Sequence, residues 1–126
     1  EEFSMPNPIR IRDRYMRDDL PIRLGGIAAN LSRIYSFSDD TDSHDIVSDL
    51  IEETGHFIEW TKSDAGISIQ TASELTQLTK VLREWAVLCS RNWLSESCRS
   101  QLSAQACEWS QRVVLLSGLL NRQKPA

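Results

Sequence analysis

Carboxylates and a histidine recur along residues 45–60 at a spacing that could place them together on one helix. Asp45, Asp49, Glu52, His56 and Glu59 fall within about 40° of one line at about 100° per residue. Such a row could bind a divalent cation, act in acid–base catalysis, or meet a basic protein surface. The apolar residues of this segment fall on the opposite side, so we predict that the row faces solvent or a partner.

The string LIEETGHFIEW, residues 50–60, resembles the first metal-binding helix of MazG-type nucleotide pyrophosphohydrolases. That resemblance implies an all-α enzyme that holds magnesium, with Glu52 and Glu53 matching the paired glutamates of the family. The metal set of the alternative hydrolase function adds Glu59. His56 stands where the family's third glutamate would be, and no E-x-x-D follows on a later helix. Magnesium prefers oxygen ligands, so we do not assign the chain to this family. A divalent-metal nucleotide hydrolase is kept as an alternative function.

Opposite charges are concentrated in different parts of the chain, whose net charge is only −4. Residues 39–61 hold eight acids and no lysine or arginine, whereas residues 65–126 hold four acids and seven bases. Like charges four residues apart destabilise a helix, so the acidic row is expected to meet something basic. That partner could lie within the same fold or in a second molecule.

Residues 1–19 form the most basic segment, and we predict an extended arm there because Pro6 and Pro8 disfavour a helix. Residues 1–4 precede Met5, so either Met5 is the native start or the chain is a fragment of a longer protein. The arm could dock on an acidic surface, stay disordered, or contact nucleic acid as a further alternative function, although a net acidic chain makes nucleic acid a weak candidate. Its contact residues are the arginines Arg10, Arg12, Arg14 and Arg17.

The remaining residues favour an all-α fold, with no strand pattern and no internal repeat. Apolar residues at helical spacing predict helices over 21–37, 44–62, 69–92 and 97–121, separated by short polar turns. Ser43 and Thr71 are the expected N-caps of the second and third helices, and Gly66 the expected left-handed residue. We therefore predict an antiparallel four-helix bundle over 20–123, with an extended N-terminal arm and a frayed tail over 124–126.

The last predicted helix is apolar on nearly every side over VVLLSGLL, residues 113–120. Val114, Leu115 and Leu119 lie off the main apolar stripe, so this end is predicted to form a second interface. Trp60 falls about 60° from the acidic row and is a candidate contact residue beside it. Homodimerisation or binding of a protein partner is the function that these surfaces favour.

Catalytic and cofactor signatures are otherwise missing from the sequence. There is no phosphate-binding glycine loop and no nucleophile elbow, so no cofactor is expected. Cys89, Cys98 and Cys107 form no CxxC pair, and we read Cys89 and Cys107 as small buried residues of a reduced, cytoplasmic protein. No window is apolar enough for a membrane span. We predict a non-enzymatic interaction or assembly module.

Overall fold

A computed structural model describes residues 8–118, and every regular element in that range is helical. A short 3-10 turn, Thr41–Ser43, precedes the third helix. The α-helices are α1 (Pro8–Arg17), α2 (Leu20–Phe37), α3 (His44–Lys62), α4 (Ile69–Arg91) and α5 (Glu96–Ser117). The predicted all-α class is therefore confirmed, and the sequence-based bounds of the four long helices are close to the observed ones. None of the helices within 8–118 has the length and apolar character that crossing a membrane requires.

The prediction of an extended arm is wrong for residues 8–17, which form α1. Pro8 stands at the first helical position, where its missing N–H group costs no hydrogen bond. Ile11 and Tyr15 are four residues apart, so both fall on the face that turns toward the other helices. The arginines of this segment therefore lie on the exposed side of an amphipathic helix. Residues 1–7 lie outside the described part of the chain.

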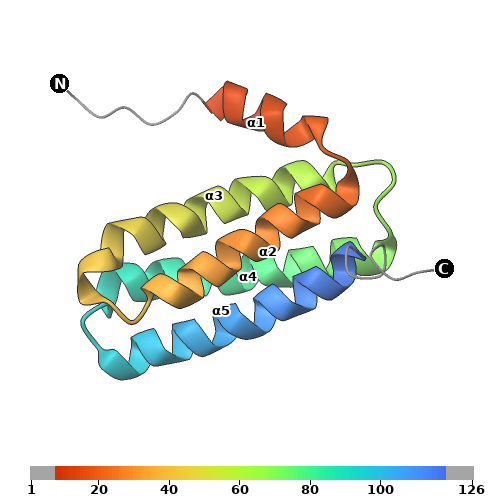
Figure 1. Ribbon diagram of the computed structural model, residues 1–126. Coiled ribbons are helices and arrows are strands. Elements are labelled where there is room, and N and C mark those ends of the chain that lie inside the picture. Colours follow the sequence, from red (N-terminus) through yellow and green to blue (C-terminus); the bar gives the residue numbers. More distant parts are fainter. Residues whose placement is uncertain (1–7, 119–126) are drawn as a thin grey trace.

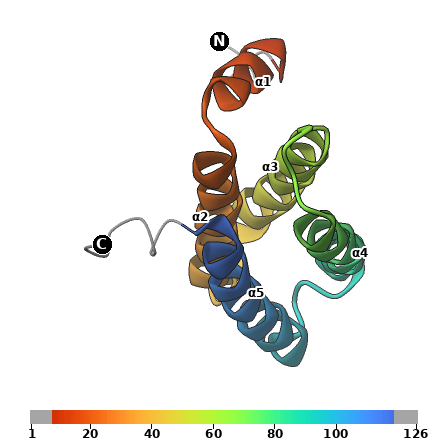
Figure 2. The same cartoon turned by 90° about the vertical axis from the view of Figure 1, so that its right-hand side faces the viewer.

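The four long helices lie side by side, and α1 lies outside them against α3 (Figures 1 and 2). Their shared core includes a fully buried residue from each: Leu31 of α2, Ile58 of α3, Leu78 of α4 and Leu102 of α5. Each long helix thus contributes an apolar face to one interior, as the helical periodicity of the sequence predicted.

Small residues of α2 allow α5 to approach closely. Ala28 is buried, and the Ser110 hydroxyl of α5 donates a hydrogen bond to the Ala28 carbonyl over 3.0 Å. A side chain larger than alanine at position 28 would hold the two backbones apart. Ala28, the small residue that lies against α5, therefore has a packing role.

The ends of the helices depart from several predicted caps. Ser68, and not Thr71, accepts a hydrogen bond at the start of α4. Ser43 is the N-cap residue of α3, as predicted, but its side chain makes no cap hydrogen bond. Asp40 instead caps the preceding 3-10 turn by accepting from the Asp42 amide over 2.9 Å. Gly118, at φ 71°, is the left-handed glycine in the described range, and Gly66 is not. Gly118 ends α5 earlier than the predicted residue 121.

A group of polar contacts links the start of α3 to the end of α4. His44 Nε2 lies 2.9 Å from the Cys89 carbonyl, and His44 Nδ1 lies 3.0 Å from the Asp45 carboxylate. The indole of Trp93 donates to the Thr41 carbonyl over 2.8 Å. Burial raises the pKa of the Cys89 thiol to about 11, which fits its prediction as a small buried residue, whereas Cys107 is only partly buried.

The contacts of His44 predict that the stability of the protein depends on pH. The Asp45 carboxylate and the Cys89 carbonyl raise the pKa of His44, because only the protonated ring can donate to both acceptors. The stabilisation by the protonated His44 ring is therefore fully present below about pH 6.5. It is lost as the pH rises through the pKa that His44 has in the folded protein. His44→Gln should lower Tm by about 2 °C in mild acid and by less in alkali. Thermal melts of both proteins across this range measure the difference, and a gap that widens with pH would contradict it.

Candidate functional site

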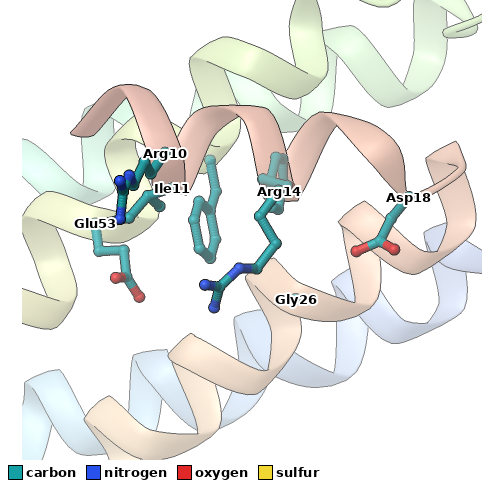
Figure 3. Close-up of a pocket in the computed structure, with 8 residues that line it drawn as sticks. Arg10, Ile11, Arg14, Asp18, Gly26 and Glu53 are labelled. Carbon is teal, nitrogen blue, oxygen red and sulfur yellow. The ribbon is translucent and has the colours of Figure 1, made fainter. Parts of the chain in front are cut away.

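A cleft between α1, α2 and α3 has a volume of about 610 Å³ (Figure 3). This lies within the range of small-molecule sites. Ile11, Tyr15, Gly26 and Phe57 give it an apolar surface. The ionisable residues that line the cleft are Arg10, Arg14 and Asp18 from α1 and the turn after it, and Glu53 from α3.

Tyr15 anchors α1 to the long helices and forms part of the cleft. Its ring stacks on Phe57 with centroids 4.2 Å apart and planes 14° from parallel. Its hydroxyl donates to the Arg23 carbonyl over 2.8 Å and lies 2.7 Å from the Thr61 hydroxyl. Burial raises the pKa of this phenol to about 12, so the group remains a donor at neutral pH.

A buried arginine fixes the connection below this anchor. The Arg23 guanidinium pairs with Asp64 over 2.6 Å, in the turn that follows α3. Its Nε donates to the Asp18 carbonyl over 2.9 Å, at the end of α1. One side chain of α2 thus holds both neighbouring connections, and this fixes the C-terminal end of α1 beside the cleft.

The four arginines predicted as contact residues all lie on α1 and are exposed. Arg10, Arg12, Arg14 and Arg17 form no ion pair with any residue of the described chain. Arg10 and Arg14, one turn apart, line the cleft, whereas Arg12 and Arg17 do not. Figure 3 shows the Arg14 side chain extending from α1 toward α2.

Glu53 does not face the same side of α3 as the acidic row, because it is hydrogen-bonded to α2. Its carboxylate accepts from the Asn30 amide of α2 over 3.0 Å, and Asn30 Oδ1 accepts from Arg33 over 3.1 Å. Glu53 therefore faces α2. By contrast, Glu52 and Glu59 line a smaller cavity of about 260 Å³ between α3 and α4, together with Arg83.

The acidic row itself lies where the helical wheel predicted. Its members, Asp45, Asp49, Glu52, His56 and Glu59, are all exposed. No three histidine, cysteine or acidic side chains between residues 8 and 118 come together as potential metal ligands. The proposed set of Glu52, Glu53 and Glu59 divides between two cavities on different sides of α3.

Trp60 connects the acidic row to the aromatic cluster of the cleft. His56 stacks on Trp60 with ring centroids 5.7 Å apart, and Trp60 contacts both Tyr15 and Phe57. Trp60 is half-buried, so it lies at the boundary between the acidic row and the packed interior. Its closest described partners are aromatic rings of α1 and α3.

The apolar end of α5 is only partly accessible. Leu115 is 73% exposed, Val114 packs against the core, and Leu119 lies outside the described residues. At the same end of the molecule, Ile69 begins α4 and is 89% exposed (Figure 1). An ion pair between Glu74 and Arg112 holds these two helix ends together.

Sequence reasoning missed Ile69 and the cleft as a whole. Ile69 and the nearby Ile67 precede the predicted N-cap Thr71, and no periodic pattern marks them. The cleft was missed because α1 was not expected to be a helix. The spacing of Ile11 and Tyr15 after Pro8 was the one available signal.

Comparisons with protein-family models, with curated proteins and with solved structures find no match to this chain.

Proposed function

We propose that this protein is a non-enzymatic assembly module that associates with a second copy of itself. The observation that carries the proposal is the pair of opposite charged surfaces that have few internal partners. Arg12 and Arg17 of α1, and Asp49, Glu52 and Glu59 of α3, form no ion pair with each other or with other described residues. Two copies of one chain can therefore provide both halves of a complementary contact.

We also infer that α2 to α5 form an antiparallel four-helix bundle, which would present this interface on a rigid body. Contacts between α2 and α3, α3 and α4, α4 and α5, and α2 and α5 support that arrangement, as do the short connections. The thiols Cys89, Cys98 and Cys107 are all free, which supports the cytoplasm as the location.

The end of the molecule formed by Ile69 and Leu115 would supply the apolar part of the interface. Exposed aliphatic side chains on two neighbouring helix ends exclude water when a partner covers them. The surrounding charges would then set the orientation and the rate of association. A metal-dependent hydrolase has less support, because Glu53 is turned away from Glu52 and Glu59.

Leu115→Glu should convert a dimer into a monomer. The substitution places a carboxylate in the apolar contact, and leaving it desolvated and unpaired would weaken association by at least about 100-fold. Size-exclusion chromatography with light scattering, at micromolar concentrations and low salt, measures the mass. Leu94→Glu is the matched control, because Leu94 is also exposed but lies between α4 and α5 at the other end. A wild-type monomer throughout this range would refute self-association.

A further inference from the structure

We propose that the cleft between α1, α2 and α3 binds a small organic monocarboxylate with an apolar body. This cleft adjoins the proposed assembly interface on α1, but neither Arg12 nor Arg17 lines it. The carboxylate would lie between the guanidinium groups of Arg10 and Arg14. The apolar body would lie on Ile11, Phe57 and the exposed surface at Gly26.

The two arginines provide the polar half of the site. Arg10 and Arg14 are four residues apart on α1, so their side chains leave the helix on nearly the same face. Both line the cleft, and neither pairs with a carboxylate of the described chain. A guanidinium presents parallel N–H donors that match the two oxygens of a carboxylate. Two such groups at one opening favour an anion there.

The charges around the cleft limit the ligand to one negative charge. Glu53 and Asp18 balance Arg10 and Arg14, so the lining has no excess positive charge to hold a polyphosphate. Glu53 accepts a hydrogen bond from Asn30, and neither arginine forms an ion pair with Glu53 or Asp18. The nearby apolar surface requires that the rest of the ligand be hydrophobic.

The backbone of α2 leaves room for that apolar body. Gly26 lines the cleft, and a Cβ placed there would lie 3.5 Å from Cε1 of Tyr15, an ordinary van der Waals contact. An alanine therefore fits, whereas a leucine would extend into the cleft. This position offers a way to fill the site while both arginines remain.

Titration with decanoate, followed by calorimetry and by amide chemical shifts, tests the proposal. Decanol and decyltrimethylammonium provide neutral and cationic probes with the same chain, all used below the concentrations at which they aggregate. Decanoate should bind at least about tenfold more tightly than either, with shifts centred on Gly26 and Phe57. Equal binding of the three probes, or shifts spread throughout the core, would overturn the proposal.

Substitutions then separate this site from the assembly interface. Arg14→Gln should weaken decanoate binding about tenfold, and adding Arg10→Gln should abolish it. Gly26→Leu should also abolish binding, whereas Gly26→Ala should retain it. Arg12→Gln, on the other side of α1, should leave decanoate affinity unchanged while weakening self-association. Equal losses in Arg12→Gln and Arg14→Gln would show nonspecific attraction to a basic helix and overturn the proposed site.

Discussion

Replacing Tyr15 with alanine should release α1 from the long helices while α2 to α5 remain folded. The substitution removes a stacked contact with Phe57 and the hydrogen bond to the Arg23 carbonyl. Truncation of a buried aromatic side chain costs about 3 kcal/mol or more. Contacts of α1 are made mainly with α3, so this loss is a large part of its docking energy. A released helix of 10 residues is too short to remain helical in water.

Hydrogen exchange resolves this local unfolding from global unfolding. Amides of Ile11 to Arg17 should lose their protection in Tyr15→Ala, while amides at the centre of α2 and α5 keep theirs. Decanoate binding should disappear as well, because Arg10 and Arg14 no longer stand over the cleft. A cooperative loss of protection in all five helices would contradict the expected result, since it would make α1 part of the main folding unit.

Tyr15→Phe is the matched control for this experiment. It keeps the ring on Phe57 and loses the hydroxyl, so its cost should be about 1 kcal/mol. The Thr61 hydroxyl keeps a bond to the Phe57 carbonyl and is not left without a partner. Exchange in α1 should therefore be faster than in the wild-type protein and slower than in Tyr15→Ala.

The four long helices could be predicted from the sequence because each has an apolar stripe with helical spacing. The buried residues of α4 repeat at three- and four-residue steps: Leu75, Leu78, Leu82, Trp85 and Cys89. The ends of the helices were harder to predict from the sequence, since a cap depends on one hydrogen bond. Ser68 and Thr71 both have suitable hydroxyls, and only the backbone geometry decides that Ser68 accepts from the Thr71 amide.

The first helix could not be recognised from periodicity because its apolar face is narrow. Ile11 and Tyr15 are its main inward residues, and the partners of Tyr15, Phe57 and Thr61, lie more than 40 residues away. Its burial is a tertiary effect, and the sequence of residues 8–17 alone has more arginines than a core-facing helix usually carries. The cleft was unpredictable for the same reason, since three separate helices form it.

The acidic side of α3 was predictable because direction on a helix follows from residue number. Glu52 and Glu59 are seven residues apart and face one side, whereas Glu53 is rotated by about 100° from Glu52. That rotation takes Glu53 to Asn30 of α2. The sequence therefore indicated which carboxylates were exposed, but not that Asn30 would bind the remaining one.

Trp85→Ala should cause the largest loss of global stability. Trp85 is 1% exposed, and its indole N–H donates to Gln105 of α5 over 2.8 Å. Removing a buried tryptophan costs about 3–5 kcal/mol through lost apolar contact and a residual cavity. This loss is a large share of the roughly 5–15 kcal/mol by which domains of this size are stable. Tm should therefore fall by about 10–20 °C. Helical circular dichroism during heating and in urea measures both quantities.

Gln105 of α5 accepts from the Trp85 indole, so the near-complete burial of Trp85 depends on α5 covering it. Trp85→Phe should cost about 1–2 kcal/mol, because the ring remains in the core while Gln105 loses its donor. Leu94→Ala is the surface control, since Leu94 is 83% exposed and its truncation should change stability by less than about 0.5 kcal/mol. Similar losses for Trp85→Ala and Leu94→Ala would mean that α4 and α5 do not pack around this indole, and that the core depends chiefly on the contact of α2 with α3 and α5.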